Sequence, residues 1–137
     1  MRVARVLLLM LALPLLAGAS DKRSARDLSG AWEGSYICGL TAMRLKLVMG
    51  GHPVGTVAGS FIIGDPAKPT GRFRVRGMYD ASANALALRG AEWEDYPREG
   101  EWATLDLVGA VDWDKHTIAG KVLGKDCTTF SVTRAGD

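Results

Sequence analysis

Residue types that carry most enzyme chemistry are scarce in this sequence. Its 137 residues include two histidines and two cysteines. His52 and His116 fall in separate predicted turns, and neither has cysteines or carboxylates at the spacing of a metal site. A general base or a nucleophile needs a partner residue, and the sequence offers no such pair. We therefore expect a non-catalytic protein without a metal site or a cofactor, in which both histidines are solvated turn residues.

The sequence also lacks an excess of charge once its first residues are set aside. Lys and Arg together number 17 and Asp and Glu 15, and two of the cations, Arg2 and Arg5, lie in a predicted leader. Removing the leader leaves 15 basic residues against 15 acidic ones. Affinity for nucleic acid depends largely on neutralising phosphates. A balanced chain has no electrostatic basis for such binding, so we expect no nucleic acid among its partners.

No hydrophobic run in the sequence is long enough to cross a membrane. The longest covers residues 6–16 and precedes the small residues Ala17, Gly18 and Ala19. A membrane-spanning helix needs about 20 apolar residues, whereas a short apolar run between cations and small residues is typical of a secretory signal peptide. We predict a cleaved leader at residues 1–19, a flexible lead-in at 20–28 and one domain at 29–135. The mature protein is expected to be periplasmic or secreted, not membrane-spanning, and monomeric.

The two cysteines, Cys38 and Cys127, remain after the leader is removed. An even number of cysteines in an exported chain indicates a disulfide. A Cys38–Cys127 bridge would close a loop of about 90 residues. The alternative is a pair of unpaired buried thiols.

Amphipathic helices are absent from the pattern after the leader, and short alternating runs of apolar and polar residues take their place. Alternation with a period of two residues predicts β-strands. In one such run Phe73 and Val75 alternate with Arg72, Arg74 and Arg76, which makes the arginines a solvated outer stripe. Residues 92–100 are irregular and contain the proline and glycine of a loop. The predicted strands cover residues 32–38, 43–47, 57–63, 72–79, 86–88, 105–111, 118–122 and 130–134.

Eight short strands joined by short turns predict an all-β fold with an antiparallel meander. Such a sheet closes into an up-and-down barrel or packs as a β-sandwich. Cys38 ends the first predicted strand and Cys127 begins the last, and those two positions meet where a barrel closes. The cysteines therefore favour the barrel, and the sandwich is the alternative. Inward-facing glycines also suit tight barrel corners, or else they leave room for a cavity; these are Gly34, Gly59, Gly77, Gly109 and Gly120.

The triplet Gly30-Ala31-Trp32 at the start of the first predicted strand resembles the Gly-x-Trp signature of lipocalins, avidins and fatty-acid-binding proteins. In lipocalins the tryptophan closes the barrel floor beneath an arginine from near the chain end, a part that the resemblance assigns to Trp32 and Arg134. The chain is shorter than a usual lipocalin, and no avidin ligand set matches it, so the resemblance implies a fold and no particular ligand.

Two further resemblances concern small exported proteins. The segment Trp32-x-Gly-x-Tyr-x-Cys38 resembles exported bacterial domains to which no activity is attached. Periplasmic metalloprotease inhibitors are similar in size, in their eight-stranded barrel and in having one disulfide, although their bridge lies within the first half of the chain.

Aromatic residues gather in and beside the predicted loop, and they are the candidate site. Trp and Tyr are enriched on recognition surfaces, and loops on a rigid scaffold often carry function. The same residues at strand ends would serve equally to cap a core. The candidates for binding a ligand or a partner are Trp93, Tyr96, Trp102 and Trp113.

Acidic residues surround these aromatics, and Asp112 and Asp114 flank Trp113. No glycine and distal glutamate follow Asp114 at the spacing of a calcium-binding loop, so this pair predicts a hairpin turn.

The function expected from these features is binding. One hypothesis is a small apolar or amphipathic molecule held inside the barrel. Another is an exported partner protein gripped by the loops, as a protease inhibitor would do. A third is an envelope protein with a packed core and no ligand.

Overall fold

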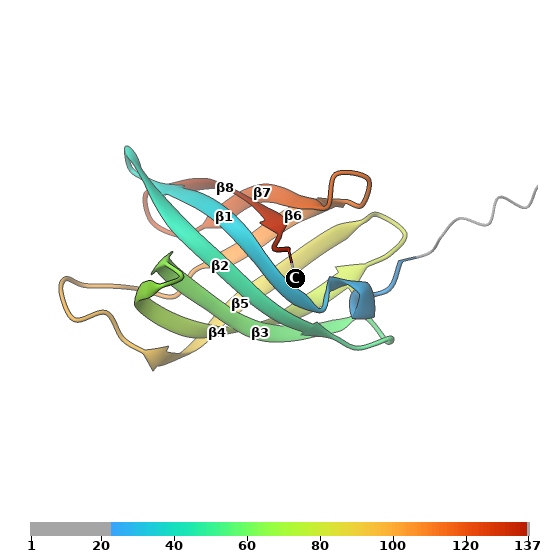
Figure 1. Ribbon diagram of the computed structural model, residues 1–137, viewed down its shortest axis with the longest axis horizontal. Helices are drawn as coiled ribbons and strands as arrows, with labels where there is room; N and C mark the ends of the chain where they lie inside the picture. Colours follow the sequence, from blue (N-terminus) through green and yellow to red (C-terminus); the bar gives the residue numbers. More distant parts are fainter. Residues whose placement is uncertain (1–22, 137) are drawn as a thin grey trace, which may run out of the picture.

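The computed structural model describes residues 23–136 and contains a closed barrel of eight antiparallel strands (Figure 1). Each strand pairs with the next along the chain, and β8 pairs with β1 to complete the ring. The prediction of an all-β up-and-down barrel is confirmed, and the sandwich alternative is wrong. The predicted leader lies outside the described residues. The strands are β1 (Gly30–Cys38), β2 (Thr41–Gly51), β3 (Thr56–Asp65), β4 (Lys68–Asp80), β5 (Ala85–Asp95), β6 (Asp106–Asp112), β7 (Thr117–Leu123) and β8 (Cys127–Arg134).

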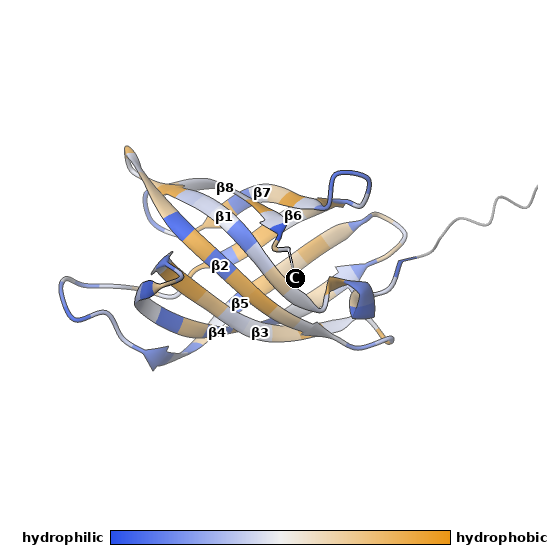
Figure 2. Ribbon diagram, viewed as in Figure 1, coloured by the Kyte–Doolittle hydropathy of each residue, from blue (hydrophilic) through white to orange (hydrophobic). Residues whose placement is uncertain are grey.

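Hydrophobic and hydrophilic residues alternate along the strands (Figure 2), and the buried hydrophobic residues fill the barrel interior. Trp32 and Phe61 are 0% exposed, and Leu45, Leu107 and Ile118 pack in the same core. Within residues 23–136 no polar or charged side chain is buried. The interior is therefore a continuous apolar core, as expected where each strand turns every second side chain inward.

The inward glycines bring neighbouring strands close together. A Cβ atom at Gly34 would collide with the carbonyl oxygen of Ser131 on β8, and one at Gly59 would collide with the carbonyl oxygen of Val48 on β2. Because backbone of the adjacent strand occupies the space beside these glycines, they allow the walls to bend and close. Of the two roles considered for them, closure of the barrel is the one that the structure supports.

The Cys38–Cys127 disulfide is present and joins β1 to β8 at the closing seam. The two cysteines are paired in register, at the end of one strand and the beginning of the other. The predicted bridge is therefore confirmed, and free thiols are excluded for the described residues. A disulfide of this kind is typical of a protein that folds in an oxidising compartment.

A short 3₁₀ helix, η1 (Ala25–Leu28), covers one end of the barrel. Leu28 is 0% exposed, and its carbonyl oxygen accepts a hydrogen bond of 2.9 Å from Trp32 Nε1. The guanidinium of Arg134 lies 4.5 Å from the centroid of the Trp32 ring and donates to the carbonyl oxygens of Ser29 and Asp27. Part of the predicted flexible lead-in thus differs from expectation, because Ala25 and Leu28 are apolar residues buried over the barrel floor.

The fifth strand is longer than predicted. β5 continues to Asp95, so residues 92–95 belong to the sheet and the irregular segment runs over 96–105. Register shifts against β4 occur near Phe73 and Arg72. These bulges break the simple alternation in this part of the sequence, which explains why it was predicted to be a loop.

Candidate functional site

The two ends of the barrel are built differently (Figure 1). One end, which η1 covers and which we call the closed end, also carries the hairpin turns at residues 52–55, 81–84 and 113–116. At the opposite end, which we call the loop end, lie the turns at 39–40, 66–67 and 124–126 and the disulfide. The loop end also carries the β5–β6 loop (residues 96–105), the longest connection in the described barrel.

A row of aromatic rings runs from the core toward the loop end. Tyr36 meets Phe61 edge to face with centroids 5.2 Å apart, and Phe61 stacks on Phe73 at 4.5 Å. Phe73 then meets Trp93 at 5.2 Å, and Trp93 meets Tyr96 at 5.0 Å. Tyr36 is 2% exposed and Tyr96 is 48% exposed. Tyr96 is therefore a surface ring supported by a rigid column of core aromatics.

Hydrogen bonds within the β5–β6 loop hold Trp102 near Tyr96. The Tyr96 hydroxyl oxygen accepts a bond of 2.9 Å from the Trp102 backbone nitrogen. Trp102 Nε1 donates to the carbonyl oxygen of Glu99, and Gly100 adopts a φ of 86° between them. Only glycine adopts that conformation readily. The loop therefore presents Tyr96 and Trp102 as a preorganised pair.

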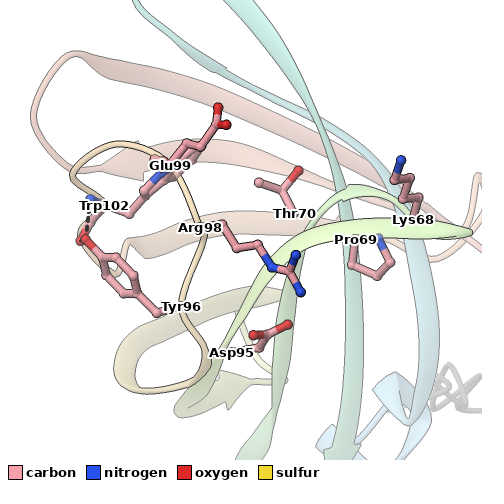
Figure 3. Close-up of a pocket in the computed structure, with 8 residues that line it drawn as sticks. All are labelled: Lys68, Pro69, Thr70, Asp95, Tyr96, Arg98, Glu99 and Trp102. Atoms are coloured by element: carbon pink, nitrogen blue, oxygen red, sulfur yellow. Dashed lines mark hydrogen bonds between the residues drawn. The ribbon is translucent and has the colours of Figure 1, made fainter.

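An outer cavity of about 720 Å³ opens beside this pair (Figure 3). One side comes from the β5–β6 loop and the end of β5, and the other comes from the start of β4. Two cations and two carboxylates line it together with aromatic and proline surface. The lining residues are Lys68, Pro69, Thr70, Asp95, Tyr96, Arg98, Glu99 and Trp102.

A second cavity of about 500 Å³, the mouth cavity, lies between the loop and the barrel rim. Trp102 lines both cavities and separates them. The walls of the mouth cavity are mainly apolar, with polar groups from a few positions. The lining residues are Tyr36, Cys38, Ile63, Glu101, Trp102, Ala103, Thr104, Leu105, Gly124, Lys125 and Cys127.

The Tyr36 hydroxyl is a polar group in the wall of the mouth cavity. Burial raises the pKa of Tyr36 to about 12, because the phenolate would lose its hydration in the apolar surroundings. The hydroxyl is therefore neutral at physiological pH and available as a hydrogen-bond donor.

Trp113 does not join the other candidate aromatics. It lies in the β6–β7 turn at the closed end, where its Nε1 donates to the Tyr79 hydroxyl at 3.0 Å. The Tyr79 hydroxyl donates in turn to Asn84 Oδ1 at 2.8 Å, and the Arg23 guanidinium lies 5.3 Å from the Trp113 ring. The structure therefore brings together Trp93, Tyr96 and Trp102 and leaves Trp113 in a separate hydrogen-bonded group.

The aspartates beside Trp113 form a turn, as predicted. Asp112 Oδ1 accepts hydrogen bonds from the backbone nitrogens of Asp114 and Lys115, both at 3.1 Å. This is the local side-chain capping that aspartate provides in tight turns. Within residues 23–136 no group of three or more histidines, cysteines and carboxylates lies close enough to hold a metal ion.

The arginine stripe of β4 lies on the outer wall, opposite acidic residues of β5. Arg72 Nε lies 2.7 Å from Glu94 Oε2, and Arg76 Nη2 lies 2.8 Å from Glu92 Oε1. The hydrogen bond from Arg76 lowers the pKa of Glu92, and the nearby charges of Arg76 and Arg74 add to that effect. The stripe is therefore a set of exposed ion pairs on the outside of the barrel, which is the solvated face that the alternation predicted.

Comparisons with protein-family models, curated proteins and solved structures find no match to this chain. The described part of the chain contains no helix long and apolar enough to pass through a bilayer. The geometry of the loop end is thus the main source of functional information.

The sequence predicted Trp93, Tyr96 and Trp102 as binding residues at the loop end, and it did not predict the other residues that line the mouth cavity, apart from the two cysteines. Tyr36, Ile63 and Leu105 look like ordinary core positions in the sequence, because each lies in an alternating strand pattern. The position of the disulfide next to them was the available signal, since Cys38 follows Tyr36 on the same face of β1.

Proposed function

We propose that this chain is an exported, non-catalytic binding protein whose mouth cavity receives a small amphipathic molecule. The supporting observation is an apolar cavity of about 500 Å³ at the barrel rim, with Tyr36, Thr104 and Lys125 as polar contributors. Ligand sites in proteins commonly have volumes of about 300 to 1,000 Å³ and combine apolar walls with a few polar groups.

The amphipathic character of the ligand follows from the two sides of this cavity. Ile63, Leu105 and the indole of Trp102 offer apolar contact, whereas the Tyr36 hydroxyl and the Lys125 ammonium offer hydrogen-bond donors. A molecule with an apolar body and one acceptor group satisfies both sides. The packed core beneath the cavity argues for binding at the rim rather than deep in the barrel.

Export to the periplasm or the exterior is supported by the leader pattern at residues 1–19 together with the Cys38–Cys127 disulfide. The closed barrel and the contact between Trp32 and Arg134 support kinship with the lipocalins, avidins and fatty-acid-binding proteins that the sequence resembles. Mass spectrometry of the mature protein tests the export proposal, with an N-terminus at or near Ser20 as the expected result.

A fluorescent amphipathic probe, anilinonaphthalene sulfonate, tests the mouth cavity directly. The oxidised protein should bind one probe molecule with an increase in probe fluorescence. Ala103→Trp fills the cavity and should remove that binding, because Ala103 lines it.

Ala110→Trp is the matched control, since Ala110 lies exposed on the outer wall of β6. This variant should bind the probe as the unmodified protein does. Equal binding by both variants, or none by the unmodified protein, would contradict the mouth cavity as a ligand site and favour the envelope protein without a ligand.

Binding of a partner protein is a second candidate function. The specific observation in its favour is the preorganised pair of Tyr96, which is 48% exposed, and Trp102, which is half-buried, on the β5–β6 loop. Rigid aromatic side chains supply contact area at a low entropic cost, which is why they dominate many recognition surfaces.

A further inference from the structure

Strand β5 has an open edge near the loop end. β5 and β6 pair through four positions, from Ala85 with Ala110 to Leu88 with Leu107. β5 then continues to Asp95, and its pairing with β4 continues as far as Asp95 opposite Arg72. Residues 89–95 therefore have a partner strand on one side only.

The chain that leads into β6 does not cover this edge as a strand. A Cβ at Gly90 would lie 2.7 Å from both the Leu105 carbonyl oxygen and the Thr104 Cβ, so this chain passes close beside β5 at Gly90. Gly90 N donates to Asp106 Oδ1 at 2.9 Å, so a side chain of β6 occupies the second position beyond the last β5–β6 pair. Among the described residues, no backbone hydrogen bond joins residues 91–95 to the β5–β6 loop.

An edge of this kind offers main-chain donors and acceptors to another extended chain. The outward side chains beside it already have partners, because Glu92 and Glu94 are paired with arginines of β4. The chemistry that remains free at the edge is therefore that of the peptide backbone, and its natural complement is a second β-strand.

The outer cavity lies at the end of the same edge. Asp95, the last residue of β5, and Tyr96, the next residue, both line it. Lys68 and Arg98 balance Asp95 and Glu99 in charge, and none of the ion pairs in the described chain involves these four residues. The cavity has no net charge to attract a side chain of one sign, whereas the rings of Pro69, Tyr96 and Trp102 offer contact to a large uncharged side chain.

We propose that residues 91–95 of β5 bind an extended segment of a partner protein by strand addition. The backbone of that segment pairs with the open edge of β5. One large uncharged side chain of the segment enters the outer cavity and packs on Tyr96 and Trp102. This peptide site is distinct from the mouth cavity and does not depend on a ligand there.

Hydrogen exchange of the free protein is the first test. The amides of residues 86–88 are held between β4 and β6, whereas amides of residues 91–95 that point away from β4 have no strand partner. We expect the latter to exchange at least about tenfold faster, the effect of losing one backbone hydrogen bond. Equal protection of all amides from 86 to 95 would overturn the proposal.

A selection of random linear heptapeptides displayed on phage, with the oxidised protein as the target, is the second test. We expect an enriched peptide that protects the edge amides of residues 91–95 from exchange. Its synthetic form should bind about tenfold more weakly for each N-methyl group placed on an amide that pairs with β5. N-methyl groups on the intervening amides are the matched control and should have little effect.

Protein variants separate the edge from the cavity. Tyr96→Ala should weaken peptide binding at least about tenfold by removing an aromatic contact. Tyr96→Phe keeps the ring but loses the hydrogen bond from Trp102 N, so it should weaken binding less than Tyr96→Ala does. Val54→Ala, an exposed position at the closed end, should change nothing. The proposal would be overturned if no peptide were enriched, or if N-methylation of the enriched peptide did not change its affinity. It would also be overturned if the protein formed concentration-dependent dimers paired through β5.

Discussion

The two ends of this barrel use their aromatic residues for opposite purposes. At the closed end, Trp32 is fully buried, donates a hydrogen bond to the Leu28 carbonyl oxygen and lies beneath the guanidinium of Arg134. At the loop end, Trp102 donates a hydrogen bond to Glu99 of its own loop and lines both the outer cavity and the mouth cavity. Contacts that are completed within the protein give stability, whereas surfaces left accessible on a rigid scaffold are the usual place for binding.

The way each end is tied to the barrel shows the same contrast. Arg134 on β8 donates hydrogen bonds to the carbonyl oxygens of Asp27 and Ser29, and these bonds hold η1 over the barrel floor. The side-chain hydrogen bonds of the β5–β6 loop join Tyr96, Glu99 and Trp102, all within that loop. We therefore expect changes at Trp32 to affect stability most, and changes in the β5–β6 loop to affect binding most.

The largest expected loss of stability follows from Trp32→Ala. Removing a fully buried indole from a closed core should cost about 3 to 5 kcal/mol of unfolding free energy. Trp102→Ala, at a half-buried position of the loop end, should cost clearly less. Urea denaturation of both variants measures the difference in unfolding free energy, and equal losses would contradict the proposed difference between the two ends of the barrel.

Loss of the disulfide should have the next largest effect. The Cys38–Cys127 bridge spans 89 positions in the sequence, and removing a bridge across a loop of this size commonly costs about 2 to 4 kcal/mol. Reduction should therefore lower the Tm of the protein. The Cys38→Ser/Cys127→Ser double variant is the control, since its Tm should not respond to the reductant. A protein whose Tm is the same with and without reductant would remove the bridge as a stabilising element.

Alkaline pH should destabilise the protein through Tyr36. Its pKa is raised from 10.0 to about 12 in the folded state, so the folded protein holds this proton more tightly than the unfolded chain does. The neutral Tyr36 phenol therefore contributes to the free energy of unfolding below pH 10. This contribution, about 2 to 3 kcal/mol in total, is lost as the pH rises toward 12.

Denaturation at a series of pH values compares the protein with Tyr36→Phe. The variant should show a smaller decline between pH 10 and pH 12, because it has no phenol at this position. Identical declines would contradict the burial of the hydroxyl at the mouth cavity.

The smallest effect on stability is expected at Tyr96. Tyr96→Ala removes a ring that is 48% exposed and should cost less than about 1 kcal/mol. Trp93→Ala should cost more, because Trp93 is half-buried and packs against Phe73. A loss above about 3 kcal/mol for Tyr96→Ala, the scale of a buried aromatic, would make Tyr96 a core residue instead of a recognition residue.

Strand alternation and the two cysteines were sufficient to predict the barrel. Each strand has one face toward a single core, so the period of two is clear in β2, β4 and β7, and Cys38 with Cys127 identifies the seam. The end of β5 was not predicted because its bulges interrupt that period at residues 91–94. Such bulges depend on the contact with β4, which the local sequence does not encode.

The site was predicted in part, for a related reason. Composition located Trp93, Tyr96 and Trp102 around the loop, but proximity in sequence also grouped them with Trp113. Strand β6 runs the length of the barrel and places Trp113 in the β6–β7 turn at the opposite end. The cavities themselves arise from the path of residues 101–105 across the barrel rim. That path depends on tertiary packing of Leu105 and Trp102 and has no periodic signature.

Binding of a small molecule at the mouth cavity is tested by native mass spectrometry of the oxidised protein, purified without refolding from the exported fraction of its own host. We predict a mature chain that carries one small molecule, and loss of that molecule from Ala103→Trp but not from Ala110→Trp. A bare protein from the native source, or a molecule retained equally by both variants, would contradict binding at the mouth cavity.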